Sequence, residues 1–215
     1  YVSFQLRFFP EYRRLRELSE TLDVQQIFFE RQRGMMSDRF MKPDAYHGIY
    51  DVVAHDIDQV LWYMRRPPLA VTCVVGRNTF APDTGVADIL SALVDFGDGH
   101  SALLFSSIGA PPVGTRYDLI GAQGNVSLTS GQPEKGEAFA RYGIRFGQHD
   151  SRPLPPSAPS ELSGDAALQA AFAREIRTGE RSQAARSRDG LNALLVSLAC
   201  DESGRTHDRV VLDLR

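Results

Sequence analysis

Three ionisable side chains and one aromatic side chain share a stripe of a segment with helical periodicity. Within residues 50–64 (YDVVAHDIDQVLWYM), Asp51, His55, Asp58 and Trp62 are spaced i, i+4, i+7 and i+11, which places them on one face of an α-helix. A carboxylate beside an imidazole favours the protonated ring and fixes its orientation, as suits a histidine that accepts a proton near neutral pH. The stripe therefore predicts that His55 is a proton acceptor, and that Asp58 offers its two oxygens to substrate hydroxyls.

The same spacing has a purely structural interpretation. Asp51 would then complement the helix dipole in the first turn, and His55 would be a satisfied residue at the edge of the core. Because Asp/His pairs at i,i+4 are common, spacing alone does not decide between the two. A metal site is chemically possible in this region, with His47, Asp51, His55 or Asp58 as ligands. The sequence has no HExxH motif and no cysteine cluster, so we predict no metal site.

Further candidates precede this helix. Residues 1–9 (YVSFQLRFF) alternate as a strand would, with Gln5 and Arg7 on the more polar face. The structural alternative for Arg7 is a surface ion pair, which contributes little to stability. His47 lies just before the helix in residues 34–49, an irregular connection long enough to suggest function.

The helix must bury its other side to hold the stripe in place. Apolar residues gather there and predict the buried stripe (Val53, Ala54, Ile57, Val60, Leu61 and Met64). Asp56 points elsewhere and is expected to be a solvated charge. Trp62 is expected to pack against protein rather than to stack on a sugar.

The remaining periodicities predict an α+β fold in a single domain over residues 1–215. Strands are expected at 1–9, 24–33, 69–78 and near the C-terminus, with two hairpins around Gly97–Gly99 and Gly121–Gly124. Helices are expected after Pro10, over 50–64, and in two segments after the proline-rich stretch 151–164, the last with Ser187 as its N-cap. This order predicts a largely antiparallel, open-faced sheet with helices packed on one face.

Composition excludes several classes of protein. Among 215 residues, 24 basic and 27 acidic side chains give a net charge of −3, which argues against a partner made of nucleic acid or anionic membrane. No stretch approaches the roughly 20 apolar residues of a membrane span. Cys73 and Cys200 are isolated and predict a reducing, cytoplasmic location. A first strand without a preceding cap or turn suggests a fragment of a longer chain.

Four stretches together resemble the C-terminal, substrate-binding domain of the Gfo/Idh/MocA family of NAD(P)-dependent oxidoreductases. FQLRFFPEYRRLREL is similar to the family's strand–Arg-x-x-Pro–helix opening, and GIYDVVAHDIDQVLW to its Gly-x-x-Asp-x-x-x-His-x-x-Asp helix. The family's late sheet segments are similar to two stretches of this sequence, ADILSALVDFGDGHSALLFSS and YDLIGAQGNVSL. The tail from FAREIRTGE to RVVL is similar to the closing helices and strand, so the resemblance spans nearly the whole chain.

The resemblance implies a function and roles for residues. His55 would be the general base that takes the hydroxyl proton of a sugar- or polyol-like substrate as hydride leaves for the nicotinamide. Asp51 would orient His55 or the substrate, and Asp58 would hold substrate hydroxyls. Gln5 and Arg7 match a cleft-lining strand only loosely, and His47 stands where many members have a second glycine.

The cofactor, NAD or NADP, would be bound elsewhere in the full-length protein. The chain has no Gly-x-Gly-x-x-Gly motif, so by itself it is expected to bind no dinucleotide. In the family a catalytic lysine lies in a Glu-Lys-Pro loop, and neither Lys42 nor Lys135 has that context. A non-enzymatic sensor or regulatory protein that uses the cofactor cleft stays open as an alternative, as does a cofactor-assisted glycosidase or dehydratase.

Apolar residues on both faces of the predicted strands bear on assembly. In residues 88–128, Leu90 and Val94 alternate with Ile89 and Leu93. If helices cover one face, the other would be a large apolar surface, which is rare on a monomer. Because domains of this family commonly associate through that face, we predict a homodimer or homotetramer formed through the open sheet.

Overall fold

The computed structural model describes the backbone of residues 1–33, 49–77, 79, 85–109, 114–131, 139–146, 150–153, 162 and 164–213. In these residues a single nine-stranded sheet has the order β8-β7-β6-β5-β1-β4-β3-β2-β9. The strands are β1 (Val24–Arg33), β2 (Ala70–Arg77), β3 (Ala87–Gly97), β4 (His100–Ile108), β5 (Gly114–Gly121), β6 (Gly124–Gly131), β7 (Phe139–Phe146), β8 (Asp150–Pro153) and β9 (Val210–Val211).

All neighbouring strands are antiparallel except β1 and β4, which run parallel in the middle of the sheet. The largely antiparallel α+β fold predicted from the sequence is therefore confirmed. Both predicted hairpins are present. β3 and β4 join through Gly97, Asp98 and Gly99, which all have positive φ, and β5 and β6 join between Gly121 and Gly124.

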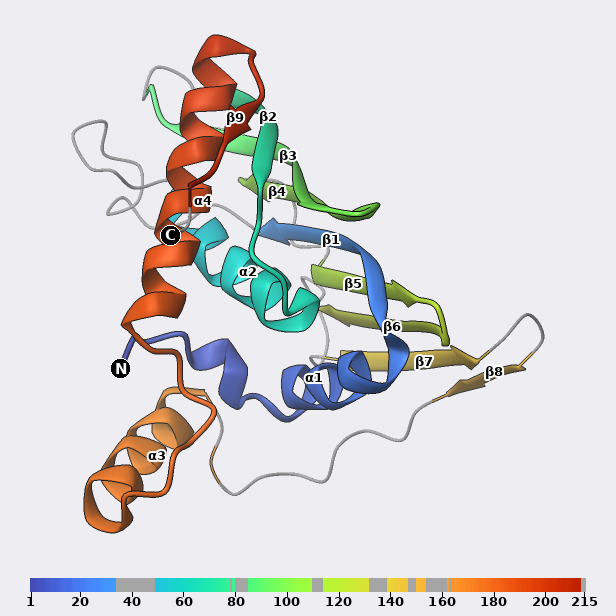
Figure 1. The fold of residues 1–215 in the computed structure, drawn as a ribbon, viewed down its shortest axis with the longest axis vertical. Coiled ribbons are helices and arrows are strands. Elements are labelled where there is room, and N and C mark those ends of the chain that lie inside the picture. Colours follow the sequence, from blue (N-terminus) through green and yellow to red (C-terminus); the bar gives the residue numbers. More distant parts are fainter. Residues whose placement is uncertain are drawn as a thin grey trace.

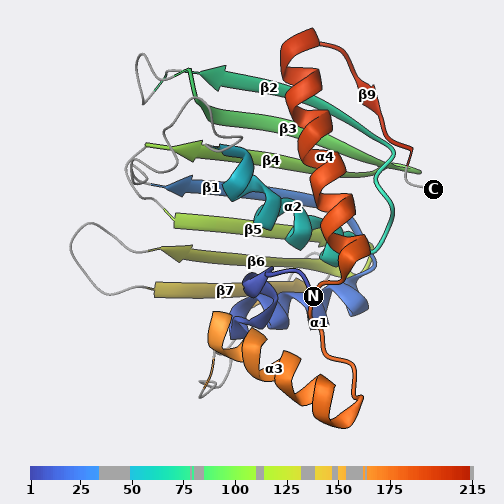
Figure 2. The same ribbon diagram turned by 90° about the vertical axis from the view of Figure 1, so that its left-hand side faces the viewer.

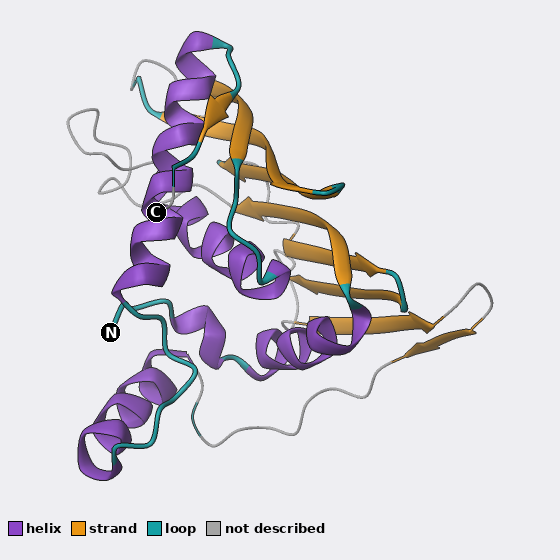
Figure 3. Cartoon of the chain, in the orientation of Figure 1, coloured by secondary structure: helices purple, strands orange, loops and turns teal. Residues whose placement is uncertain are grey.

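Three helices cover one face of this sheet, as Figures 1 and 2 show: α1 (Pro10–Leu22), α2 (Ile49–Met64) and α4 (Ser187–Thr206). The fourth, α3 (Gly164–Thr178), lies beside the short 3₁₀ helix η1 (Gln5–Phe8), away from the sheet (Figure 3). On the covered face every second residue of the central strands is buried, for example Leu90, Ala92 and Val94 of β3. This alternation is typical of a sheet with one face in the core.

The opposite face of the sheet carries exposed apolar side chains. Leu93 of β3, Leu103 and Phe105 of β4 and Ile120 of β5 each expose about two-fifths of their surface, and Val74 of β2 exposes 65%. Leu93 and Leu103 are direct cross-strand partners, and Leu103 also pairs with Phe28 of β1. The prediction that apolar residues occupy both faces of the central strands is confirmed.

The opening segment differs from its prediction. Residues 1–9 do not form a strand: Val2 makes one isolated bridge with Ala185, and Gln5–Phe8 wind into η1. Both edges of β1 are already paired, with β4 and β5, so the opening residues have no free central strand beside them. In η1 the buried residues are Arg7 and Phe8, so Arg7 faces the interior together with an apolar neighbour.

The ends of the last two elements also needed adjustment. The N-cap of α4 is Arg186 rather than Ser187, and its backbone N–H donates to the Asp189 carboxylate over 2.7 Å. The final strand is shorter than its apolar run, since only Val210 and Val211 pair with β2. No helix in the described ranges has the length and apolar character to cross a membrane.

Candidate functional site

Helix α2 is held in place by its apolar stripe, which confirms the helix predicted from periodicity. Val53, Ile57 and Val60 are almost completely buried against the covered face of the sheet. α4 packs along another side of the same helix, as Figure 2 shows. The position and rotation of α2 are thus fixed on two sides, and its candidate residues are carried on a rigid element.

His55 lies half-buried on α2, and its ring meets the edge of Phe4 just before η1. The two ring centroids are 5.5 Å apart, with an interplanar angle of 75°. Asp51 lies one helical turn earlier, on the same face of α2 by backbone position. The side chain of Asp51 and all of His47 lie outside the described residues. The pairing of acid and imidazole therefore stays a prediction.

Asp58 and Arg7 form a buried bidentate ion pair between α2 and η1. Arg7 donates from Nε to Oδ2 over 2.9 Å and from Nη2 to Oδ1 over 2.5 Å. Burial raises the pKa of the Asp58 carboxyl above its ordinary value, and the hydrogen bonds from Arg7 oppose that rise. The alternative of a surface pair for Arg7 is wrong, because both side chains are almost fully enclosed.

Further contacts tie Arg7 to the chain before α4. Its Nη1 donates to the Gln183 carbonyl over 3.5 Å, and the Gln183 amide donates back to the Arg7 carbonyl over 2.5 Å. Asp189 of α4 lies 3.4 Å from Nη2. Arg7 thus joins η1, α2 and α4. Gln5, its neighbour on η1, is half-buried, and it lies on a 3₁₀ helix rather than on the polar face of a strand.

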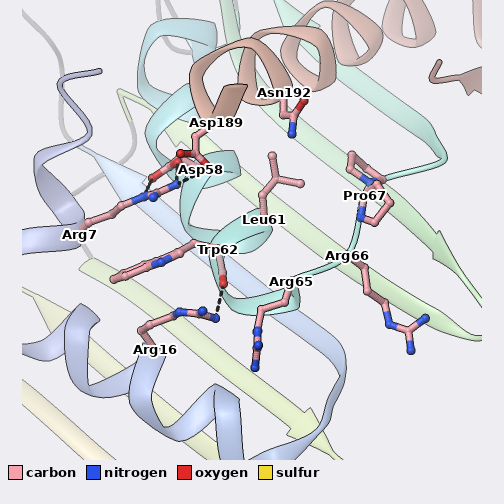
Figure 4. A pocket seen from close by; sticks show the side chains of 11 residues that line it. Arg7, Arg16, Asp58, Leu61, Trp62, Arg65, Arg66, Pro67, Asp189 and Asn192 are labelled. Atoms are coloured by element: carbon pink, nitrogen blue, oxygen red, sulfur yellow. Dashed lines mark hydrogen bonds and ion pairs between the residues drawn. The ribbon is translucent and has the colours of Figure 1, made fainter. Parts of the chain in front are cut away.

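A pocket of about 420 Å³ opens beside this ion pair, between α1, the C-terminal end of α2 and the first turns of α4 (Figure 4). Its lining is rich in arginine (Arg7, Arg16, Asp58, Leu61, Trp62, Arg65, Arg66, Pro67, Pro68, Asp189 and Asn192). Of the predicted site residues, Arg7 and Asp58 line this pocket. His55 and Gln5 do not line it. The structure therefore separates the predicted site residues into those that line this pocket and those that do not.

Trp62 is enclosed by cations rather than presented as a flat platform. The guanidinium carbon of Arg7 lies 5.2 Å from its ring centroid, and that of Arg16 lies 5.6 Å away. Tyr63 stacks against the same ring at 5.7 Å. Both arginines are within the range of cation–π attraction. This arrangement agrees with the prediction that Trp62 packs against protein.

Asp56 is the clearest departure from the sequence-based interpretation, because it is fully buried instead of solvated. Its Oδ1 lies 2.7 Å from Nη2 of Arg31 on β1, and that arginine is also enclosed. Helix α2 is buried on more than one side, and Asp56 lies one turn from both Val53 and Val60 and faces Arg31 on β1. Arg31 likewise alternates in phase with Ile27 and Phe29, so both charges occupy core positions.

Burial shifts the titration of this pair. Desolvation raises the pKa of Asp56 to about 6, although Arg31 and Arg33 lower it. Burial alone would lower the pKa of Arg31, but Asp56 and Tyr117 raise it above its ordinary value. A carboxyl whose native pKa exceeds its unfolded pKa contributes most stability below about pH 4, and that contribution declines as the pH rises to about 6.

Sequence reasoning missed several residues that line the pocket or fix α2. Arg16, Arg65, Arg66, Asp189 and Asn192 come from three elements far apart in the chain. No spacing rule connects them, although the Arg65–Arg66 pair at the end of an amphipathic helix was a visible signal. Within the described residues, no three His, Cys, Asp or Glu side chains are close enough together to hold a metal ion.

The residues that the structure describes define a class by architecture: an open-faced α+β domain with helices on one face of a largely antiparallel sheet. Residues 20–127 match the family model described as the GFO/IDH/MocA C-terminal domain. The match covers half of the chain. This chain belongs to the Gfo/Idh/MocA family, as its sequence resemblance implied.

Solved structures share the fold over nearly the entire chain. A protein from Thermotoga maritima assigned as an oxidoreductase superposes with a TM-score of 0.79 at 16% identity, over 97% of this chain and 62% of that one. The aldose-aldose oxidoreductase of Caulobacter crescentus superposes with a TM-score of 0.79 at 20% identity, over 96% of this chain and 62% of that one. A protein of Sinorhizobium meliloti 1021 assigned as a myo-inositol dehydrogenase superposes with a TM-score of 0.74 at 20% identity, over 98% of this chain and 64% of that one.

The chain therefore spans less than two thirds of the length of these relatives. At such identities the likeness establishes the fold and not the substrate. A search of curated proteins gave no match.

Proposed function

We propose that this chain is the substrate-binding and catalytic domain of an NAD(P)-dependent oxidoreductase. Hydride would pass between the nicotinamide and a hydroxyl or carbonyl group of a sugar- or polyol-like substrate. The observation that carries the proposal is the match to the family's C-terminal domain, on a fold shared with an aldose-aldose oxidoreductase over 96% of the chain. The candidate general base, His55, stands on α2, whose apolar side belongs to the hydrophobic core.

In this proposal the chain supplies the proton chemistry and the binding of substrate. His55 takes the proton of the reacting hydroxyl at its imidazole, and Asp51, one turn away, fixes the orientation of the ring. The nicotinamide, when bound, supplies the acceptor or donor of hydride. The sequence offers no glycine-rich phosphate loop that would fit a dinucleotide, so the cofactor would be held by residues outside this chain.

The other predicted binding residues take different parts in this proposal. Both oxygens of Asp58 already accept hydrogen bonds from Arg7, so substrate hydroxyls would have to share them. We therefore propose that Arg7 and Asp58 chiefly position η1 and Phe4 against His55. Contacts of Gln5 and His47 with substrate stay predictions, as does the cytoplasmic location inferred from the cysteines.

The full-length protein should reduce NAD⁺ or NADP⁺ in the presence of some member of a panel of aldoses, ketoses, inositols and linear polyols. Absorbance of the reduced nicotinamide measures the reaction, and calorimetry measures binding of the cofactor. The 215-residue chain alone should bind neither dinucleotide with useful affinity. Tight binding of NAD(P) to the isolated chain would contradict the assignment. Binding of NAD(P) by the full-length protein without turnover of any substrate would favour the alternative of a non-enzymatic sensor.

We further propose that two copies associate through the open face of the sheet. The exposed apolar residues of β2 to β5 support this, since such a surface is rarely left in water. Leu103 lies at the centre of this face, between its register partners Phe28 and Leu93. Association would remove all three side chains from solvent.

Sedimentation should show a dimer or tetramer at micromolar concentration, and Leu103→Lys should shift the protein to monomer. The added ammonium would lose its hydration in the interface, which is costly for an unpaired charge. Ile176→Lys, at an even more exposed apolar position on α3 (69% against 43% for Leu103), is the control and should leave the assembly intact. A wild-type monomer, or an unaffected Leu103→Lys assembly, would exclude this interface.

A further inference from the structure

We infer that the pocket at the C-terminal end of α2 binds a phosphate monoester. Three arginines besides Arg7 contribute to its lining: Arg16, Arg65 and Arg66. Figure 4 shows Arg16 and Arg65 next to each other below Trp62, whereas the Arg66 side chain begins beside Pro67 and extends away from the other two. The inference rests on this pocket alone and not on the role of His55, which does not line it.

The charges of the pocket are not balanced by the protein. Arg7 pairs with Asp58 and also lies 3.4 Å from Asp189. The two acidic side chains of the lining are therefore both next to Arg7. Among the acidic side chains that the structure describes, Arg16 pairs with Glu20, at 3.2 Å, and Arg66 with Asp98, at 3.6 Å. The Glu20 side chain is half exposed and that of Asp98 is almost fully exposed. Such exposed pairs hold a cation weakly. Arg65 makes no ion pair with any residue that the structure describes.

The pKa of Arg16 is lowered chiefly by burial, and neighbouring arginines make a smaller contribution. Burial lowers the pKa of its guanidinium, and Arg65 and Arg7 lower it further, whereas Glu20 raises it. Like charges are thus close enough to repel one another at this opening. A dianion placed between them would relieve the repulsion, and it would form charge-assisted hydrogen bonds, which are among the strongest in proteins.

The backbone at Arg65 is left-handed, as it is at the ends of two other helices, α1 and α4. Arg65 ends α2 in the left-handed conformation, with φ +59°, and its N–H donates to the Leu61 carbonyl over 3.1 Å. Glycine is preferred at this position of a helix end because it has no Cβ to strain. A residue with a Cβ, such as arginine, is less stable here than glycine would be.

The remaining lining fits the anionic end of a small phosphorylated molecule. The carboxamide of Asn192 on α4 has its nitrogen turned toward the pocket (Figure 4), where it could donate to a phosphate oxygen. The first turn of α4 also brings the positive end of its dipole. Because Arg7 and Arg16 occupy the faces of Trp62, an uncharged sugar has no ring to stack on. The volume leaves room for a body of sugar size.

One structural alternative is that the arginines only complement the negative end of the α2 dipole. Arg16 does so in part, since its Nη1 donates to the Trp62 carbonyl over 2.7 Å. Arg65 and Arg66 make no such bond to the carbonyls of the last turn within the described residues. The helix end therefore does not account for them.

Calorimetry on the full-length protein at low ionic strength tests the inference, with inorganic phosphate, glucose 6-phosphate and glucose as probes. Both phosphates should bind, and glucose should not. Arg65→Gly and Arg66→Ala should each weaken phosphate binding by about 10-fold or more, the usual effect of losing a hydrogen bond to a charged group. Arg65→Gly should also keep or raise the melting temperature, because glycine relieves the backbone strain.

Arg14→Ala is the matched control. Arg14 lies on the same helix as Arg16, is partly exposed and pairs with Glu17, outside the pocket. This variant should bind phosphate as the wild type does. Failure of the wild type to bind either phosphate, or unchanged affinity in both Arg65→Gly and Arg66→Ala, would overturn the inference and leave the arginines a purely electrostatic role at the helix end.

Discussion

His55→Ala in the full-length protein should lower kcat for hydride transfer by about 10²- to 10⁴-fold, the range found when a general base is removed. Alanine cannot accept the hydroxyl proton, so the loss should fall on kcat while KM changes little. The ring of His55 contacts Phe4, and its removal leaves a small gap at the edge of the core rather than in its centre. We expect the variant to stay folded, which circular dichroism and thermal melting can verify.

A second histidine supplies the control for that experiment. His207 is exposed and ends α4 in the left-handed conformation, with φ +65°, which asparagine also adopts readily. His207→Asn should therefore keep both stability and turnover. Wild-type kcat in His55→Ala would exclude His55 as the base, and the family assignment would survive without this mechanism.

Arg31→Met should lower the free energy of unfolding by about 3–5 kcal/mol at pH 7.5, as expected when one partner of a buried ion pair is removed. The reason is that Asp56 is completely buried and Arg31 is the cation 2.7 Å from its carboxylate. Without Arg31, the ionised form of Asp56 loses its main compensation. Urea titration monitored by circular dichroism measures the change.

The pH dependence has a definite sign. The pKa of Asp56 is already raised to about 6 by burial, and loss of Arg31 raises it further. As the pH falls, Asp56 becomes protonated and no longer needs a cation. The difference in unfolding free energy between wild type and Arg31→Met should therefore shrink between pH 7.5 and pH 4.5. A deficit that is constant over this range would mean that lost packing, and not the carboxylate, causes the destabilisation.

Two further variants separate charge from shape. Arg116→Met changes an exposed arginine on β5, the neighbouring strand, and should alter stability by less than about 1 kcal/mol. The double variant Arg31→Met with Asp56→Leu removes both charges and should recover most of the loss, because apolar residues often replace a buried pair without cost. No recovery would indicate that the pair contributes through its specific geometry.

The two ion pairs of α2 explain why a helix with so many charged residues is stably buried. Asp56 faces Arg31 on the sheet, and Asp58 faces Arg7 on η1. Each pair connects α2 to another element by charge, and the Arg7–Asp58 pair adds two hydrogen bonds. These contacts hold His55 and the pocket-lining Trp62 at fixed places along the same helix.

The sequence by itself determined the elements whose cause is local. The hairpin at Gly97–Gly99 follows from glycines that accept positive φ, and α2 follows from its 3.6-residue apolar period. Those elements, in their order along the chain, also determined the open-faced α+β class and carried the resemblance to the family. Local backbone preference and periodicity are properties of neighbouring residues, so no tertiary information was needed.

Only the tertiary structure decided which charges are buried and where the pocket lies. Alternation alone predicted a strand for residues 1–9, yet the sheet offers them no free central edge, and Arg7 turns inward to Asp58. Asp56 is enclosed because α2 faces β1 on that side, and the pocket gathers arginines from α1 and α2 beside an asparagine of α4. Pairing and burial depend on what the folded chain brings alongside each residue, which spacing along the sequence does not encode.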